Sequence, residues 1–415
     1  MSFETISVIG LGYIGLPTAA MFASRKKKVI GVDVNQNTVE IINRGDIHIV
    51  EPNLDMIVHA AVTEGYLKAV IEPEPADAFL IAVPTPFFPS EEGKNPKPNL
   101  SYVEMASKAI ARVLKKGDLV ILESTSPVGT TEKVSYWLSR ERPDLSFPHQ
   151  SADNADVNIA HCPERVLPGQ VVRELVENDR VIGGMSNTCS NRSVELYKTF
   201  VKGECVITNA RTAEMAKLTE NSCRDVQIAF ANELSIICDK LDINVWELIS
   251  LANRHPRINI LQPGPGVGGH CIAVDPWFIV DCAPEEALLI KQARIINDLK
   301  PYHVIDKITK AADEFKRPVI ACLGLAFKAD IDDLRESPAL QIVKELAIKN
   351  IGKVIAVEPN VNELTEDLRQ LGIELMSLKD ALSQANIVSI LVDHKEFRQL
   401  KHINGKVIID TKGIF

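Results

Sequence analysis

The sequence predicts an α/β protein with two doubly wound parallel sheets joined by a central helical region. Short, nearly continuous apolar runs alternate with helix-length segments at both ends of the chain, and this alternation stops in the middle. Such runs are typical of strands that helices bury on both faces, and strand–helix alternation produces parallel sheets with right-handed crossovers. We therefore expect three domains, over residues 1–210, 211–315 and 316–415.

The composition fits a globular chain of this kind. Its 415 residues are 46% hydrophobic and 24% charged, which excludes a disordered or fibrous protein. A net charge of −9 disfavours nucleic acid as a partner. No apolar run approaches the ~20 residues of a membrane span, we expect no signal peptide, and the eight scattered cysteines form no zinc motif. These features predict a cytoplasmic protein that binds no metal and no membrane.

The first predicted strand runs into a glycine motif. Predicted strands cover Ile6–Gly10, Val29–Val34, Ala78–Val83, Leu119–Leu122 and Val157–Ala160, with helices at Pro17–Ser24 and Tyr102–Leu114. The motif, Gly10-Leu11-Gly12-Tyr13-Ile14-Gly15, links the first strand to the first helix. In that context Gly10 permits a tight turn, Gly12 lets the backbone approach a pyrophosphate, and Gly15 allows close packing of helix on strand.

The second strand ends at Asp33, 18 residues after Gly15. A carboxylate there accepts hydrogen bonds from the adenosine ribose and repels a 2′-phosphate, which favours NAD over NADP. An ordinary glycine turn followed by a surface aspartate is the alternative. Two more strand ends carry Thr85 and Thr125, which are candidates for contacts with the cofactor or with water, because ligands sit beyond the carboxyl ends of strands. Thr131 is a third candidate, or a helix cap.

The middle of the chain is helical. We expect helices at Thr212–Asp239, at Val245–Leu251 and at roughly Pro284–Phe315, with a Gly/Pro-rich loop over 262–269. Lys217, Asn221 and Arg224 fall at i, i+4 and i+7 of the long helix and therefore share one face. Such a face binds an oxyanion or a phosphate, or is merely a solvated polar surface.

One cysteine stands apart from the other seven. Cys271 follows two glycines and precedes an expected helix start, with Asp275 one helical turn further on. Thiolates are favoured near helix N-termini, so Cys271 is a candidate nucleophile, although a single cysteine is commonly inert and buried. Glu164 offers another carboxylate in a loop after a buried strand.

The last hundred residues return to strand–helix alternation. Strands are expected at Val319–Leu325, Lys353–Val357, Ile387–Leu391 and Val407–Ile409, and a helix at Pro338–Ile348. The polar, Pro-rich segment Phe87–Pro98 is expected to be an exposed loop.

These residues together resemble the nucleotide-sugar 6-dehydrogenases of the UDP-glucose/UDP-mannuronate type, over essentially the whole chain. The markers are the N-terminal glycine motif, Glu123-Ser124-Thr125, Pro163-Glu164, the Lys217/Asn221 helix, Gly268-Gly269-His270-Cys271 with Asp275, Gly324-Leu325-Ala326-Phe327-Lys328 and Asp333-Leu334-Arg335-Glu336-Ser337-Pro338. Within the family, the segment from His255 to Cys271 resembles the UDP-N-acetyl-D-mannosamine branch. Pro168 stands where the glucose enzymes commonly carry a second Glu.

The resemblance implies two Rossmann-like domains, for NAD and for the UDP moiety, around a helical dimerisation region. It implies a four-electron oxidation of UDP-N-acetyl-D-mannosamine to the uronate, consuming two NAD⁺, for surface polysaccharides such as enterobacterial common antigen. Cys271 becomes the nucleophile, Lys217 and Asn221 the partners of the C6 oxygen, Asp275 and Thr125 water-positioning groups, and Glu164 an assisting base. Residues that match nucleotide-sugar contacts are Arg165, Val166, Lys217, Asn221, Arg224, His255, Arg257, Gly268, Phe327, Lys328 and Lys412, and Arg335 matches a residue that reaches NAD.

Three alternatives remain. The first is a 6-dehydrogenase of another UDP-hexose, such as UDP-glucose or UDP-GlcNAc. The second is a two-electron hydroxyacid dehydrogenase, which needs no nucleophilic cysteine and yields one NADH per substrate instead of two. The third is a nucleotide-sensing module without catalysis.

Overall fold

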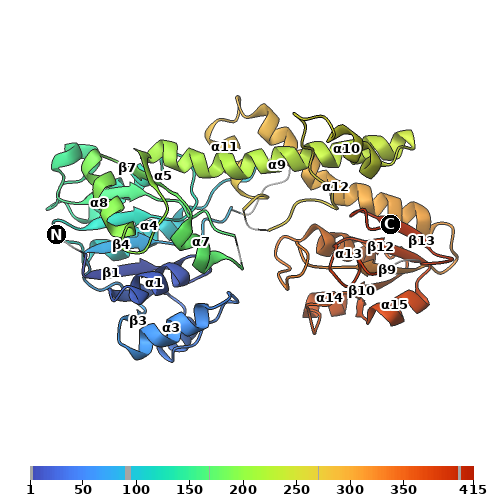
Figure 1. The fold of residues 1–415 in the computed structure, drawn as a ribbon, viewed down its shortest axis with the longest axis horizontal. Helices are drawn as coiled ribbons and strands as arrows, with labels where there is room; N and C mark the ends of the chain where they lie inside the picture. The colour runs from blue at the N-terminus through green and yellow to red at the C-terminus, as the bar shows by residue number, and fades with distance from the viewer. Residues whose placement is uncertain (1–2, 89–94, 168, 270, 401–402) are drawn as a thin grey trace. The chain divides into compact units, whose positions relative to one another are not determined.

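The structure is a computed structural model that describes residues 3–88, 95–167, 169–269, 271–400 and 403–415. It forms two compact units, Met1–Thr219 and Glu220–Phe415, each built around one sheet (Figure 1). Among the described helices, none combines the length and the apolar character that crossing a bilayer requires.

The first unit holds an eight-stranded sheet in the order β3-β2-β1-β4-β5-β6-β7-β8. Neighbouring strands are parallel except β6 and β7. The strands are β1 (Thr5–Ile9), β2 (Lys28–Val32), β3 (Leu67–Val70), β4 (Ala78–Ile81), β5 (Leu119–Leu122), β6 (Asn158–His161), β7 (Arg180–Gly184) and β8 (Cys205–Asn209).

Helices cover both faces of this sheet, because alternate residues of each central strand point to opposite sides. In β5, Leu119 and Ile121 join one apolar core, while Val120 and Leu122 join the other. All four side chains are fully buried. The helices of this unit are α1 (Gly15–Ser24), α2 (Gln36–Asn43), α3 (Leu54–Thr63), α4 (Ser101–Ala111), α5 (Thr130–Glu141), α6 (Pro148–Ser151), α7 (Val171–Glu177) and α8 (Asn187–Tyr197), with a 3₁₀ turn at Ala152–Asn154.

Helix α9 (Ala210–Leu241) begins in the first unit and ends in the second. The second unit continues with α10 (Val245–Ala252), α11 (Asp275–Cys282) and α12 (Leu288–Ala312), and then a five-stranded parallel sheet in the order β11-β10-β9-β12-β13. Its elements are β9 (Val319–Leu323), α13 (Pro338–Ile348), β10 (Lys353–Val357), α14 (Glu366–Gln370), β11 (Glu374–Leu375), α15 (Leu378–Gln384), β12 (Ile387–Ile390) and β13 (Val407–Asp410).

The first strand of each sheet ends in the same backbone arrangement. Gly10 follows β1 with φ +92°, and its N–H donates to the Val32 carbonyl at 2.8 Å. Gly324 follows β9 with φ +96°, and its N–H donates to the Val357 carbonyl at 2.8 Å. Both positions need glycine, because a Cβ would lie 2.6 Å from the Ala82 carbonyl oxygen in one case and 2.4 Å from Val392 in the other. The two sheets therefore start alike.

The expected α/β architecture is confirmed, and each expected strand and helix overlaps an observed element. Strands β3, β7, β8 and β11 were not expected, and the antiparallel β6–β7 pair departs from a wholly parallel sheet. These strands lack a continuous apolar run: β7 begins with Arg180 and ends in two glycines, and most of β8 is exposed or half-buried. Of the polar loop Phe87–Pro98, the two ends pair with each other, and residues 89–94 lie outside the described residues.

Candidate active site

The glycine motif forms a cradle at the carboxyl end of β1. A Cβ on Gly15 would lie 1.8 Å from the Gly10 carbonyl oxygen, so helix and turn meet without room for a side chain. Gly12 has no atom within 4 Å of its Cβ position, which leaves open space over its backbone. Helix α1 starts at Gly15 without a side-chain cap, next to Tyr13 and Ile14. An open backbone turn at an uncapped helix N-terminus fits the pyrophosphate of a dinucleotide.

Asp33 lies where the ribose-binding carboxylate was expected, one residue beyond β2. Its Oδ2 accepts a hydrogen bond from the Leu11 N–H at 3.0 Å, and its Oδ1 accepts one from the Asn35 N–H at 2.9 Å. The carboxylate is thus fixed against the glycine turn and remains partly exposed. It retains lone pairs for the hydroxyl groups of a ribose.

The ends of β4 and β5 meet beside this cradle. The Thr85 hydroxyl donates to the Thr125 carbonyl at 2.6 Å, and the Ser124 hydroxyl donates to the Val83 carbonyl at 2.7 Å. Thr85 and Thr125 are therefore neighbours at one edge of the sheet, both half-buried. The expectation that these strand ends converge is confirmed.

Thr131 lies at the start of α5 and is fully buried. Its hydroxyl and its N–H both donate to Glu214 Oε1, at 2.6 and 2.7 Å, and the Gly129 N–H donates to Glu214 Oε2 at 2.6 Å. The α9 carboxylate thus caps the N-terminus of α5, so Thr131 bonds to the cap instead of providing it. Sequence reasoning missed Glu214, because 83 residues separate it from Thr131.

Glu164 belongs to a buried charge network that sequence reasoning did not find. Its Oε2 accepts from Arg180 Nη2 at 2.7 Å, and its Oε1 accepts from the Arg165 N–H at 2.8 Å. The Arg180 guanidinium also lies 3.6 Å from Glu123 Oε1 and stacks on the Tyr197 ring, 4.3 Å from its centroid. Arg180 is 4% exposed and therefore orients Glu164 through a rigid contact.

Glu123 is the second carboxylate of this network. Tyr197 donates to its Oε1 at 2.6 Å, while its Oε2 is buried without a hydrogen-bond partner among the described residues. Burial raises the pKa of Glu123 to about 7, and the nearby Glu164 charge adds to the increase. The sequence signal for this network was Arg180, an arginine within a strand. A buried cation needs a buried anion, so such an arginine predicts a buried carboxylate nearby.

In the second unit, Asn221 and Asp275 form a close pair. Asn221 Nδ2 donates to Asp275 Oδ2 at 2.5 Å, and Asp275, the first residue of α11, is 3% exposed. The Asp275 N–H donates to the Cys271 carbonyl at 2.9 Å, so this turn links the cysteine to the pair. Cys271 is exposed, as a nucleophile must be. Lys217, one turn before Asn221 on α9, is half-buried in the first unit.

The glycine loop before Cys271 packs on the loop after β9. A Cβ on Gly268 would lie 2.5 Å from the Glu336 carbonyl oxygen and 2.9 Å from the Phe327 Cβ, so only glycine fits. The structure therefore brings Gly268 and Phe327 together, as expected for residues of one site. The marker residues His270 and Pro168 lie outside the described residues.

A buried histidine and glutamate hold the loop that carries Phe327. Glu358 Oε2 accepts from the Leu325 N–H at 2.8 Å and from His394 Nε2 at 3.0 Å. His394 Nδ1 accepts from the Asp330 N–H at 2.9 Å, which assigns the ring proton to Nε2. The pair thus binds the loop at both ends, before and after Phe327. Glu358 follows β10 as Asp33 follows β2, and this correspondence in the sequence could have identified Glu358 as a residue that binds the preceding turn.

The other candidate residues lie nearer the surface. Lys412 Nζ pairs with Asp393 at 3.3 Å, and the Arg335 guanidinium binds Asp333, with Nη2 to Oδ2 at 2.6 Å. Arg165 and Val166 are half-buried in the first unit, where Val166 packs against the core. The exposed candidates of the second unit are Arg224, His255, Arg257 and Lys328. Known proteins that resemble the chain show which family it belongs to.

Three profiles of the UDP-glucose/GDP-mannose dehydrogenase family match the chain: the NAD binding domain over residues 4–201, the central domain over 211–299 and the UDP binding domain over 321–415. The UDP-N-acetyl-D-mannosamine dehydrogenase of Campylobacter jejuni is 66% identical over 96% of this chain and 97% of its own length. The NDP-N-acetyl-D-galactosaminuronic acid dehydrogenase of Ralstonia nicotianae is 63% identical over 100% of this chain and 97% of its own.

Among solved structures, the UDP-D-ManNAc dehydrogenase of Pyrococcus horikoshii matches 99% of this chain and 96% of its own, with a TM-score of 0.87 and 39% identity. Profiles, relatives and fold all agree with the family that the sequence resembles. The chain belongs to the UDP-glucose/GDP-mannose dehydrogenase family and is an NAD-dependent oxidoreductase.

Proposed function

We propose that this protein oxidises UDP-N-acetyl-D-mannosamine at C6 to UDP-N-acetyl-D-mannosaminuronate, consuming two NAD⁺ and one water per sugar. The observation that carries the proposal is the cluster of Cys271, Asp275 and Asn221. An exposed thiol that one turn links to a buried carboxylate, itself paired with the half-buried Asn221 amide, serves covalent chemistry. A two-electron dehydrogenase has no use for such a thiol.

The Gly10–Gly15 turn and Asp33 would hold NAD⁺, which would supply the hydride acceptor for both oxidations at C6. The aldehyde formed by the first oxidation must be retained for the second. Cys271 Sγ adds to its carbonyl carbon to give a thiohemiacetal, and oxidation of that adduct leaves a thioester. Water then attacks the thioester carbon, which releases the carboxylate and returns the thiolate.

We assign the remaining polar groups to orientation and proton transfer. Lys217 and Asn221 donate to the C6 oxygen as negative charge develops on it. Asp275 and Thr125 position water. Glu164, held by Arg180, assists as a base. The nucleotide sugar is contacted by Arg165, Val166, Arg224, His255, Arg257, Gly268, Phe327, Lys328 and Lys412. Thr85 lines the cofactor side and Arg335 reaches NAD, whereas Thr131, fully buried against Glu214, supports the start of α5.

The number of electrons transferred tests the reaction. With limiting UDP-N-acetyl-D-mannosamine and excess NAD⁺, the absorbance at completion should correspond to two NADH per sugar. One NADH per sugar would overturn the four-electron reaction, and no NADH from any nucleotide sugar would point to a sensing module.

An amino sugar of the galacto configuration is the second candidate. The Ralstonia relative supports it, because that enzyme is named for N-acetyl-D-galactosaminuronic acid and is 63% identical. Steady-state rates on UDP-N-acetylmannosamine, UDP-N-acetylgalactosamine, UDP-N-acetylglucosamine and UDP-glucose separate the candidates. A higher kcat/KM for any sugar other than the first replaces the proposed substrate.

We further propose a cytoplasmic homodimer with the three-domain organisation given above. NAD and nucleotide sugars are made in the cytoplasm, and α9 carries an apolar stripe that supports self-association. Phe230, Ile237 and Leu241, at i, i+7 and i+11, are 52%, 45% and 59% exposed. Sedimentation should give a dimer for the native protein and a monomer for Ile237→Glu. Ile348→Glu, which changes an exposed isoleucine of α13, serves as the control.

A further inference from the structure

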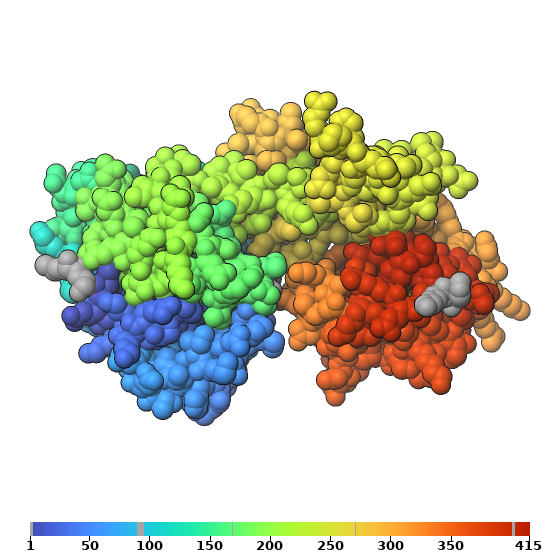
Figure 2. Space-filling view, in the orientation of Figure 1, coloured from blue at the N-terminus to red at the C-terminus, as the bar shows by residue number. Residues whose placement is uncertain are grey.

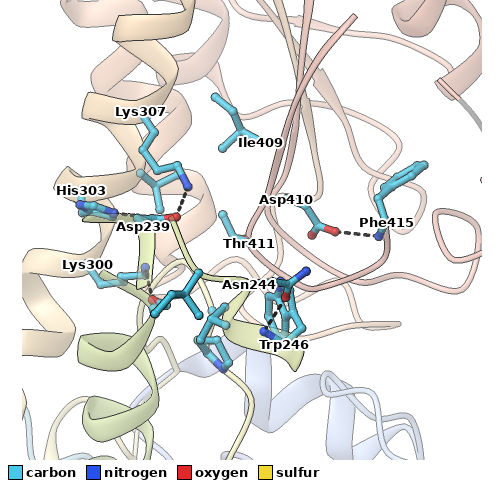
Figure 3. Close-up of a pocket in the computed structure, with 16 residues that line it drawn as sticks. Asp239, Asn244, Trp246, Lys300, His303, Lys307, Ile409, Asp410, Thr411 and Phe415 are labelled. Atoms are coloured by element: carbon cyan, nitrogen blue, oxygen red, sulfur yellow. Dashed lines mark hydrogen bonds and ion pairs between the residues drawn. The ribbon is translucent and has the colours of Figure 1, made fainter. Parts of the chain in front are cut away.

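The second unit contains a cavity of about 230 Å³ that none of the roles above uses. Its walls are α9, the start of α10, the loop at Pro263–Gly264, α12 and the C-terminal segment after β13 (Figure 3). In Figure 2 the yellow segment that includes α10 lies directly on the red C-terminal segment. At that contact a Cβ on Gly413 would come within 2.6 Å of the Trp246 ring.

One wall of the cavity is cationic. Lys300, His303 and Lys307 occupy positions i, i+3 and i+7 of α12, so they share a face, and all three line the cavity. The facing carboxylate, Asp239 of α9, accepts from His303 Nε2 at 2.8 Å and from Lys307 Nζ at 2.7 Å. Its single charge is therefore already shared between two donors.

The other carboxylate of the cavity is committed to the backbone. Asp410 Oδ1 accepts from the N–H groups of Lys412 and Gly413 at 2.7 and 2.8 Å, and Asp410 Oδ2 accepts from the Phe415 N–H at 2.8 Å. These three bonds hold the turn after β13, on the side of the cavity away from Lys300 (Figure 3). Among the described residues, Asp410 therefore forms no ion pair with the cationic wall.

Lys300 is the key member of the wall. It is 5% exposed, and its Nζ donates to the Ser235 hydroxyl at 2.6 Å. Among the described residues, no carboxylate oxygen lies within 4.0 Å of this ammonium, which has two further N–H donors. Burial lowers the pKa of Lys300 to about 8. Its counter-charge, Asp239, lies beyond ion-pair distance and already bonds to His303 and Lys307, so an anion that entered the cavity would lower the cost of burying this cation.

We propose that this cavity is a binding site for a phosphate group, as free phosphate or a small phosphomonoester, with Lys300 and Lys307 as its charged donors. The volume equals about seven or eight water molecules at ~30 Å³ each, which suits such an anion. It is below the ~300 Å³ at which sites for larger ligands begin. His303 and Lys307 offset Asp239, which would otherwise repel the ligand.

The site is distinct from the proposed catalytic cluster. Asn221 and Asp239 lie 18 residues apart on α9, and at ~1.5 Å per residue this separates them by roughly 27 Å. One ligand does not extend from the C6 oxygen at Asn221 to the ammonium groups of α12. Gly264 of the cavity wall has Lys412 Nζ 3.9 Å from its Cβ position, so saturating UDP is needed in the experiment to separate this cavity from the nucleotide-sugar site.

Calorimetric titration of the full-length protein with inorganic phosphate tests this proposal. Saturating NADH and UDP fill the dinucleotide and nucleotide-sugar sites beforehand. The native protein should still bind one phosphate per chain. Lys300→Met and Lys307→Met should each weaken binding by about tenfold or more, because each removes a charged donor. Lys310→Met should bind as the native protein does, since Lys310 lies on the same helix but pairs with Asp306 at the surface.

Two results would overturn the proposal. The first is the absence of phosphate binding to the native protein at saturating NADH and UDP. Any binding seen without NADH and UDP would then belong to the dinucleotide and nucleotide-sugar sites. The second is native-like affinity in both Lys300→Met and Lys307→Met. Lys300→Met should keep or raise the melting temperature without phosphate, because an apolar chain replaces a buried charge. Should it fail to fold, Lys307→Met decides alone. If glycerol phosphate binds more tightly than inorganic phosphate, the ligand is a phosphomonoester. If glycerol phosphate does not bind, the ligand is free phosphate.

Discussion

The buried carboxyl of Glu123 should make the stability of the first unit depend on pH in an unusual direction. Its pKa of about 7 in the folded protein lies above its ordinary value of 4.5. The folded state therefore binds more protons than the unfolded state between these values, and stability falls as pH rises from 4.5 to 7. At ~1.4 kcal/mol per pKa unit, the 2.5-unit difference amounts to about 3 kcal/mol.

Glu123→Gln removes this dependence, because a carboxamide does not titrate and still offers an oxygen to the Tyr197 hydroxyl. Near pH 4.5 the variant and the native protein should differ little. At pH 8 the variant should be more stable by about 3 kcal/mol, since only the native protein must hold a buried carboxylate. The gain should develop between pH 5 and pH 7.

Urea unfolding at a series of pH values measures this difference. Trp137 is the one tryptophan of residues 1–219, so changing Trp246 and Trp277 to Phe makes fluorescence report the first unit alone. Glu132→Gln is the control: Arg211 lowers the pKa of Glu132, so its carboxyl stays ionised and the difference should be flat from pH 5 to 8. A flat profile for Glu123→Gln as well would refute the argument from burial.

Three further predictions concern the ligand sites. Asp33→Ala should raise the KM for NAD by about tenfold or more and reduce discrimination against NADP; a native enzyme that already prefers NADP would contradict this. Cys271→Ala should abolish uronate formation. In Cys271→Ser incubated with substrate and NAD⁺, mass spectrometry should show an added UDP-uronosyl mass on the peptide that contains residue 271. Near-native turnover of the alanine variant would mean that the thiol has only a structural role. His394→Phe keeps an aromatic ring beside Phe397 but loses the ring hydrogen bonds to Asp330, Asn360 and Glu358, so the KM for the nucleotide sugar should rise about tenfold with kcat nearly unchanged. An unchanged KM would contradict the role of His394 in holding the Phe327 loop.

Local chemistry explains what could be predicted from the sequence. Backbone geometry requires glycine at positions 10 and 15, and Gly12 leaves open space between them, so the spacing of the three glycines alone located the cradle. The helix expected after Cys271 is present, but it begins at Asp275, one turn later than the pattern placed it. The strands that helices bury on both faces were visible as apolar runs.

Contacts between distant segments explain what the sequence did not reveal. Glu214 caps α5 although 83 residues separate it from Thr131. Arg180 contacts Glu123 from β7, a strand that the sequence did not predict because it ends in two glycines. Neither Glu214 nor Arg180 stands in a recognisable sequence motif, so the sequence does not distinguish them from other acidic or basic residues. Only the folded chain identifies which charges meet.

Two similar strand ends in one chain would compete for a dinucleotide if both offered a carboxylate to ribose. Asp33 is partly exposed and contacts backbone amides, whereas Glu358 is 4% exposed and has the His394 imidazole 3.0 Å from one oxygen. Glu358 Oε2 therefore already has two donors, the imidazole and the Leu325 N–H, on a carboxylate that is nearly inaccessible to a ribose hydroxyl. Of two strand ends built alike, only the one at Asp33 thus presents an accessible carboxylate.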